Sequence, residues 1–311
     1  MYKSKKRFKP LLVLVLVIFS VNLYAASLPD ELLNIPIGLI SGESVSLVEY
    51  KGKKPVYLKF WATWCQPCRK QMPQFEHVKK QYGDSIEVIG INLGINDDLN
   101  AVKEVMEEFA LTMPMAIDKN GDLAQAFRLV GTPYHLLFDR NMNLIHQGHE
   151  ANESLDNILS MLSQSKSVDL LDVGLLSERE LDIKLATNDG RTHALFFTAT
   201  WCDWYLKDSR PEISKNCTIA QRSVNTFSRQ YPNIVWNEIL SRLWTGDKDL
   251  LDYKKKHAIT HPLEIDKSNR LFHQYSVKDL PTLVLIKDNE VALKITDFSD
   301  QEKIEKILNK K

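Results

Sequence analysis

The chain has 311 residues, enough for two domains of ordinary size, because single hydrophobic cores rarely grow past about 250 residues. Hydrophobic residues make up 44% and charged residues 26%, with 12 glycines and 12 prolines, which excludes disordered, collagen-like and many-pass membrane chains. Lys plus Arg and Asp plus Glu both number 40, so no global positive charge points to nucleic-acid binding.

The N-terminal segment has the order of a secretory signal. Basic residues are frequent in Lys3–Lys9, an unbroken apolar run follows at Leu11–Phe19, and small residues stand at Ala25–Ser27. This order predicts a signal peptide over residues 1–26, and an uncleaved N-terminal anchor is the alternative. Both interpretations place the rest of the chain outside the cytoplasmic membrane, in the periplasm, where a disulfide can persist.

The following segment, residues 27–163, predicts strands that alternate with helices. Val56–Trp61 is apolar apart from Lys59, as expected of a buried central strand. Pro67 falls in the first turn of the next helix, where a missing N–H costs nothing, and Pro73 falls inside that helix and should kink it. Further elements are expected as a strand at Ile86–Asn92, helices at Leu99–Phe109 and Asp122–Arg128, strands at Tyr134–Phe138 and Leu144–His146, and a helix at Ser154–Leu162.

The same design occurs twice in the chain. Leu58–Cys65 aligns with Leu195–Cys202, an offset of 137 residues, with six of eight positions identical. An X-Pro pair follows each, at Thr132–Pro133 and Leu280–Pro281. The second copy is expected to contain a helix running to Tyr231, strands at Thr282–Ile286 and Val291–Ile295, and a helix at Gln301–Leu308. The sequence therefore predicts two tandem α/β domains, each a central mixed sheet flanked by helices, with a linker at residues 164–174 and a second domain over 175–311.

The chemistry is expected at Cys65 and Cys68, a CxxC pair between a buried strand and a helix. At the helix N-terminus unsatisfied N–H groups and the dipole stabilise a thiolate, and the residue three positions on returns to the same side. The pair can therefore exchange with a partner disulfide. Half of a zinc site and an inert buried pair are the alternatives, but the histidines show no ligand spacing, so we expect no metal and no other cofactor.

Trp64-Cys65-Gln66-Pro67-Cys68, within Phe60–Pro73, resembles the active-site segment of the TlpA/ResA-like branch of the thioredoxin superfamily, the extracytoplasmic thiol–disulfide oxidoreductases. Gly131-Thr132-Pro133 resembles that family's cis-proline loop. The resemblance covers roughly residues 35–163 and implies a thioredoxin-like fold. It also implies that Cys65 is the attacking thiol, Cys68 the resolving thiol and Pro133 a cis residue beside them, with Trp64, Pro67 and Thr132 in support.

Two positions depart from the family pattern. Lys59 stands where thioredoxins carry a buried carboxylate, and Gln71 stands where the TlpA/ResA-like branch often has Glu. One hypothesis is that the Lys59 amine faces the sulfurs, has a pKa lowered by burial and stabilises a Cys68 thiolate. The alternative is that Lys59 extends to the sheet edge and takes no part in catalysis.

The second copy has lost the reaction pair, since Tyr205 occupies the position of the resolving cysteine after Cys202. Cys217 lies 15 residues further on, near the expected start of a helix. We expect a Cys202–Cys217 disulfide, either structural or a slower redox pair, and two independent thiols are the alternative. We expect the second domain to serve in binding, with the Leu280–Pro281 loop and the sheet edge as candidate surfaces.

The leading interpretation is a periplasmic thiol–disulfide oxidoreductase, acting as a reductase on protein substrates. By resemblance, a membrane thiol carrier of the DsbD/CcdA type supplies its electrons, and no nucleic acid is involved. The main alternative is a client-binding chaperone or scaffold built on the second domain, with redox activity secondary. A thiol peroxidase lacks the required Thr/Arg environment around a cysteine, and the CxxC spacing does not suit the familiar thioredoxin-like copper chaperones.

Overall fold

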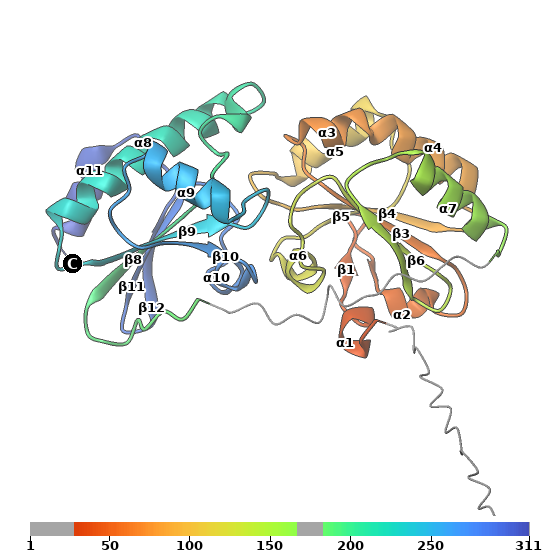
Figure 1. Cartoon of the computed structure of the whole chain (residues 1–311), viewed down its shortest axis with the longest axis horizontal. Helices are drawn as coiled ribbons and strands as arrows, with labels where there is room; N and C mark the ends of the chain where they lie inside the picture. Colours follow the sequence, from red (N-terminus) through yellow and green to blue (C-terminus); the bar gives the residue numbers. More distant parts are fainter. Residues whose placement is uncertain (1–27, 167–182, 311) are drawn as a thin grey trace, which may run out of the picture.

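The computed structural model describes residues 28–166 and 183–310, and within them the chain forms two five-stranded sheets (Figure 1). The predicted signal peptide and most of the predicted linker lie outside the described residues. Among the residues that are described, no helix combines the length and the apolar character needed to cross a membrane.

The first sheet has the strand order β5-β4-β3-β6-β7. Strands β3, β4 and β5 are parallel, and β6 and β7 are antiparallel additions at the other side of β3. The strands span Val56–Trp61 (β3), Glu87–Asn92 (β4), Met115–Ile117 (β5), Tyr134–Phe138 (β6) and Leu144–Gly148 (β7). This is the mixed sheet expected from the sequence, with the short edge strand β5 added to it.

Helices cover both faces of this sheet: in Figure 1, α4 and α7 lie on one side and α6 on the other. The helices are α3 (Gln66–Lys70), α4 (Met72–Tyr82), α5 (Leu99–Glu108), α6 (Asp122–Ala126) and α7 (Glu153–Ser163). Four short elements precede them: α1 (Asp30–Leu33), β1 (Ile37–Gly38), β2 (Ser44–Val45) and α2 (Leu47–Tyr50). Helices α5 and α7 begin where the side chains of Asp98 and Asn152 accept a backbone N–H, which satisfies one of the free donors of the first turn.

The segment after β3 differs from the single kinked helix that the sequence predicted. The chain forms two helices, α3 and α4, with Gln71 ending one and preceding the other. Pro73 has no backbone N–H to donate, so the residue lies in the first turn of a new helix, where no donor is needed. The break leaves Cys65 and Cys68 at the start of a short, separate helix.

The second sheet repeats the first, with strand order β10-β9-β8-β11-β12 and the same pattern of parallel and antiparallel pairs. Its strands are β8 (Thr192–Thr198), β9 (Val235–Ser241), β10 (Leu263–Asp266), β11 (Thr282–Lys287) and β12 (Glu290–Ile295). Its helices are η2 (Tyr205–Lys207), α8 (Pro211–Gln230), α9 (Asp247–Lys256), α10 (Arg270–Gln274) and α11 (Gln301–Leu308). The internal repeat is therefore confirmed at the level of topology, and the chain is two tandem thioredoxin-like domains. The domain boundaries themselves stay predictions.

The two domains share one hydrophobic cluster. Buried side chains of the first domain, including Trp64 and Cys65, are continuous with Trp201, Cys202 and Leu243 of the second. Because the cluster runs through the CxxC segment, the contact between the domains lies at the predicted reaction site. The packing of the second domain is therefore part of the description of that site.

Candidate active site

Cys65 and Cys68 form a disulfide at the entrance of α3, with 5.2 Å between their Cα atoms. Cys65 is the residue immediately before the helix, and its sulfur accepts the backbone N–H of Cys68 at 3.2 Å. Pro67 lies in the first turn of α3, as predicted. The helix N-terminus places its free N–H groups and positive dipole end next to the Cys65 sulfur, an environment that favours a thiolate once the bond is reduced.

The loop before β6 has the cis peptide bond that the family resemblance implied, between Thr132 and Pro133. The carbonyl oxygen of Pro133 accepts a hydrogen bond from Nδ1 of His149 at 2.7 Å. The equivalent bond of the second domain, between Leu280 and Pro281, is also cis. Both copies of the repeat have thus kept the loop, although only the first has kept the CxxC pair.

Lys59, the position that departs from the family, is fully buried and does not reach the sheet edge. Its Nζ donates to Oε1 of Gln71 at 3.1 Å and lies 5.2 Å from the centre of the Phe75 ring. Burial lowers the pKa of Lys59 to about 7, because the ammonium has lost its water and no carboxylate replaces it. The two departures noted in the sequence, Lys59 and Gln71, therefore contact each other.

The hydrogen bonds around Gln71 fix the proton positions in this network. Nε2 of Gln71 donates to the carbonyl of His149 at 3.0 Å, so Oε1 is the atom that faces Lys59 and His135. Oε1 can only accept, so Nε2 of His135 carries the proton, and Nδ1 accepts from the Tyr57 hydroxyl at 2.6 Å. Burial, followed by the nearby Lys59, lowers the pKa of His135 to about 2, and its ring is therefore neutral. No local pattern in the sequence indicates this role of His135, because its partner Gln71 lies on another element.

Residues of the second domain pack against the CxxC segment, a contact that the sequence did not predict. Cys65 and Cys68 both have an exposed fraction of 0%. The backbone N–H of Gln66 donates to the Tyr205 hydroxyl at 3.1 Å, and the Trp64 ring stacks on Trp201 with 5.0 Å between ring centres. Tyr205 was recognised only as the residue that replaces a resolving cysteine, and no local pattern in the sequence shows that it reaches the other domain.

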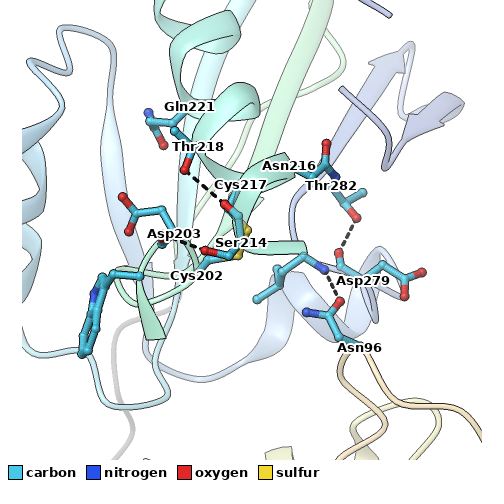
Figure 2. The surroundings of a disulfide bond; sticks show 12 residues. Asn96, Cys202, Asp203, Ser214, Asn216, Cys217, Thr218, Gln221, Asp279 and Thr282 are labelled. Atoms are coloured by element: carbon cyan, nitrogen blue, oxygen red, sulfur yellow. Dashed lines mark hydrogen bonds between the residues drawn. A yellow bond between two sulfur atoms is a disulfide. The ribbon is translucent and has the colours of Figure 1, made fainter. Parts of the chain in front are cut away.

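The second domain has the Cys202–Cys217 disulfide that was predicted, with 5.9 Å between Cα atoms (Figure 2). Both cysteines are buried. Cys217 lies in the second turn of α8, which begins at Pro211, so it is near the start of the helix, as expected. Figure 2 also shows Asn96 of the first domain beside the cis-proline loop of the second, where its Oδ1 accepts the backbone N–H of Leu280 at 2.8 Å. The Leu280–Pro281 loop, expected to be a free binding surface, is therefore in contact with the first domain.

Within residues 28–166 and 183–310, no group of three or more His, Cys, Asp or Glu side chains is arranged to hold a metal ion. The four cysteines are joined in the two disulfides, so each thiol has a sulfur partner. The site as observed is suited to thiol–disulfide exchange.

Comparisons with known proteins agree with this geometry. The redoxin family model matches residues 38–162. The thiol-disulfide oxidoreductase ResA of Bacillus thuringiensis subsp. konkukian (strain 97-27) is 30% identical over 133 residues, 42% of this chain and 75% of ResA. The thioredoxin-like protein YneN of Bacillus subtilis (strain 168) is 34% identical over 125 residues, 39% of this chain and 72% of YneN.

A solved structure of a secreted Mycobacterium tuberculosis disulfide oxidoreductase, described as homologous to E. coli DsbE, is also similar. It is 20% identical with a TM-score of 0.38, and the match covers 44% of this chain and 99% of that protein. Through its first domain, the chain belongs to the redoxin family of ResA-like thiol–disulfide oxidoreductases.

Proposed function

We propose that the protein is a periplasmic thiol–disulfide reductase that acts on protein disulfides through Cys65 and Cys68. The observation that carries the proposal is the Cys65–Cys68 disulfide at a helix N-terminus, in a domain of the ResA-like family. The signal-like order of the N-terminal residues supports the periplasm as its location.

The reaction requires no group beyond the two sulfurs and a client disulfide. In the reduced protein the Cys65 thiolate attacks one client sulfur, the client S–S bond breaks, and the other client sulfur leaves as a thiolate. The thiolate of Cys68 then attacks the Cys65 sulfur of the mixed disulfide and releases the second client thiolate. Two electrons pass to the client, and the protein is left with the Cys65–Cys68 bond seen in the structure. A membrane thiol carrier of the DsbD/CcdA type is the proposed electron donor that reduces this bond again.

The reduction potential of the Cys65–Cys68 couple tests the direction of electron flow. A value of about −270 mV supports a reductase, and a value of about −120 mV would identify an oxidant of client thiols instead. Cys202→Ser/Cys217→Ser is the background for this measurement, because it leaves a single redox pair. Fractionation of cells that express the full chain, with determination of the mature N-terminus, tests the location, and a cytoplasmic product would contradict it.

The scaffold alternative is separated from the reductase by Cys65→Ser. A reductase loses all turnover of protein disulfides in this variant, while a chaperone or scaffold retains its effect on client aggregation. The structure favours the reductase, because the Leu280–Pro281 loop of the second domain contacts Asn96 rather than lying open.

A further inference from the structure

The contact between the domains is built from the parts that surround the disulfide. The Trp64 ring, next to Cys65 in sequence, meets Trp201 face to face and Trp244 edge to face, with 5.9 Å between the Trp64 and Trp244 ring centres. Tyr205 completes this aromatic cluster and bonds the backbone of Gln66, inside the CxxC pair. No part of either active-site cysteine is exposed beneath it.

Trp244 of the second domain packs against the first-domain loop that leads to the cis-proline Pro133. Its backbone N–H donates to the carbonyl of Val130 at 2.8 Å. Its indole lies against Gly131 so closely that a Cβ atom on that glycine would be 2.6 Å from Nε1. An extended polypeptide that pairs with an exposed backbone edge makes the same kind of main-chain hydrogen bond. The second domain therefore offers the Val130–Pro133 loop both a backbone donor and a large aromatic side chain.

The contact is reciprocal, as in a two-fold symmetric dimer. The N–H of Asn96, in the loop after β4, donates to the carbonyl of Lys278 at 3.0 Å, just as Trp244, in the loop after β9, donates to Val130. Asn96 and Trp244 both have a left-handed backbone, with φ of 51° and 50°. Each domain thus inserts one loop against the cis-proline loop of the other, a self-complementary arrangement of the kind found in isologous interfaces.

Polar contacts also join the two domains. Nη2 of Arg210, just before α8, donates to Oγ1 of Thr63 at 2.7 Å and lies 3.6 Å from Oδ1 of Asp97, whose side chain is fully buried. Nε2 of His273 lies 2.6 Å from Oδ1 of Asp122 on the opposite domain. Both pairs join the two domains, so the contact between the domains is anchored at more than one point.

We propose that Trp244 holds the place of a client residue on the Val130–Pro133 loop, so that the second domain shields the Cys65–Cys68 disulfide and a protein client reaches it by displacing this contact. The inference rests on the proposed function for the identity of the visitor, a disulfide-containing polypeptide. A client that replaces Trp244 supplies a backbone N–H to Val130 and a bulky aromatic side chain to the surface of Gly131. The favoured clients are therefore extended segments with an aromatic residue beside the reacting cysteine.

The first experiment measures access to the disulfide in the full-length oxidised protein. Wild type, Trp244→Ala and Arg210→Ala are treated with reduced thioredoxin and, separately, with dithiothreitol. Differential alkylation and peptide mass spectrometry follow Cys65 and Cys68 apart from Cys202 and Cys217. We expect both variants to react with thioredoxin at least about tenfold faster than wild type, because a weaker contact raises the population of the open form. The dithiothreitol rate should rise less.

Trp204→Ala is the matched control, since Trp204 is 59% exposed and its indole N–H donates within its own domain, to the carbonyl of Thr200. Its reaction rate should stay within twofold of wild type. Equal rates with thioredoxin in wild type, Trp244→Ala and Arg210→Ala would overturn the proposal. Circular dichroism of each variant establishes that the domains are folded. Arg210→Ala removes no side chain from the hydrophobic core, because the Arg210 side chain is partly exposed.

Amide hydrogen exchange reports closure without any redox reaction. The N–H groups of Asn96 and Trp244 both donate across the interface, so they should be protected in wild type, and Asn96 should exchange faster in Trp244→Ala. Unprotected amides in wild type would contradict the closed form. Because this readout and the thioredoxin rate do not depend on the direction of electron flow in the cell, they stand even where the reduction potential rejects a reductase.

The second experiment tests the kind of client. Reduced protein is offered two disulfide-linked peptides that are identical except for Trp or Ala beside the cysteine. We expect a kcat/KM higher by about tenfold for the Trp peptide, and this preference should shrink in Gly131→Val, in which the surface for the aromatic ring is filled. Equal kcat/KM values for the two peptides would overturn the assignment of Trp244 as a stand-in for a client residue.

Discussion

At the scale of single residues, the unusual feature of the site is a buried lysine without a carboxylate. Lys59 donates to Gln71, and Gln71 is held in turn by His135 and by the carbonyl of His149. Gln71 stands in α3–α4, the break that follows Cys68, so the network joins β3 to the segment that carries the resolving cysteine. Lys59 is therefore linked through Gln71 to the segment that follows Cys68, and its effect on the Cys68 thiol stays a prediction.

The pKa of the Cys68 thiol should depend on Lys59. Lys59→Met removes an amine that can take up a proton on the buried side of the site, and we expect the pKa of the Cys68 thiol in the reduced protein to rise by about one unit. Thiol pKa values are measured from the pH dependence of alkylation, resolved by peptide mass spectrometry. Lys70→Met is the control, because Lys70 is exposed and water screens its charge. Unchanged thiol pKa values in Lys59→Met would remove the hypothesis.

Lys59 should also make stability depend on pH in the oxidised protein. Burial lowers the pKa of Lys59 from 10.5 to about 7, so between these values the unfolded chain binds more protons than the folded chain. The free energy of unfolding then rises with pH across this window, since the cost of burying the amine is present below the folded pKa and is lost above the unfolded pKa. Urea unfolding of wild type and Lys59→Met is measured at pH 7 and pH 10. The free energy of unfolding of wild type, relative to that of the variant, should be higher at pH 10 than at pH 7. A constant difference between the two proteins would contradict the lowered pKa.

At the scale of elements, the close contact between the first sheet and α4 depends on Gly90 of β4. A Cβ atom there would lie 2.5 Å from Sδ of Met115 and 3.3 Å from the Phe75 ring. Sδ of Met115 also accepts the Trp61 indole N–H at 3.2 Å, so a shift of this sulfur would lose that contact. Phe75 in turn lies under Lys59, and the position of Gly90 therefore supports the buried side of the site.

Gly90→Val should destabilise the protein by about 1–3 kcal/mol, the usual effect of excess volume in a packed core. Gly38→Val is the matched control in another strand, because no atom lies within 4 Å of a Cβ built at Gly38. Both are compared with wild type by urea unfolding. A Gly90→Val variant as stable as Gly38→Val would show that Met115 and Phe75 adapt without cost.

The limits of prediction from the sequence also appear at this scale. The central strand Val56–Trp61 and the final helix Gln301–Leu308 were predicted with the bounds that the structure has, because continuous apolar runs and helical periodicity are local signals. The edge strand Met115–Ile117 was missed, since three residues are too few for a period to show. The Lys59–Gln71 contact and the Tyr205–Gln66 contact depend on which elements meet in space, and no pattern within one segment contains that information.

At the scale of the whole molecule, the contact between Gly131 and Trp244 allows a test from both sides. Gly131→Val alone should open the interface, because its side chain meets the Trp244 indole. In the double variant Gly131→Val/Trp244→Ala, the loss of closure should be smaller than the sum of the losses in the two single variants. The smaller residue at position 244 leaves room for the valine. The protection of the Asn96 amide in the four proteins of this double-mutant cycle measures the coupling. Strict additivity would show that Gly131 and Trp244 act independently.

The repeat itself has a consequence for how firmly the site is closed. Two halves of a symmetric pair usually meet as separate molecules, and dilution pulls them apart. Here the halves belong to one polypeptide, so each experiences the other at an effective concentration of roughly millimolar order, however little protein the compartment contains. A client protein at micromolar concentration must bind this surface much more tightly than the second domain does in order to displace it. Only a few well-matched clients should therefore bind.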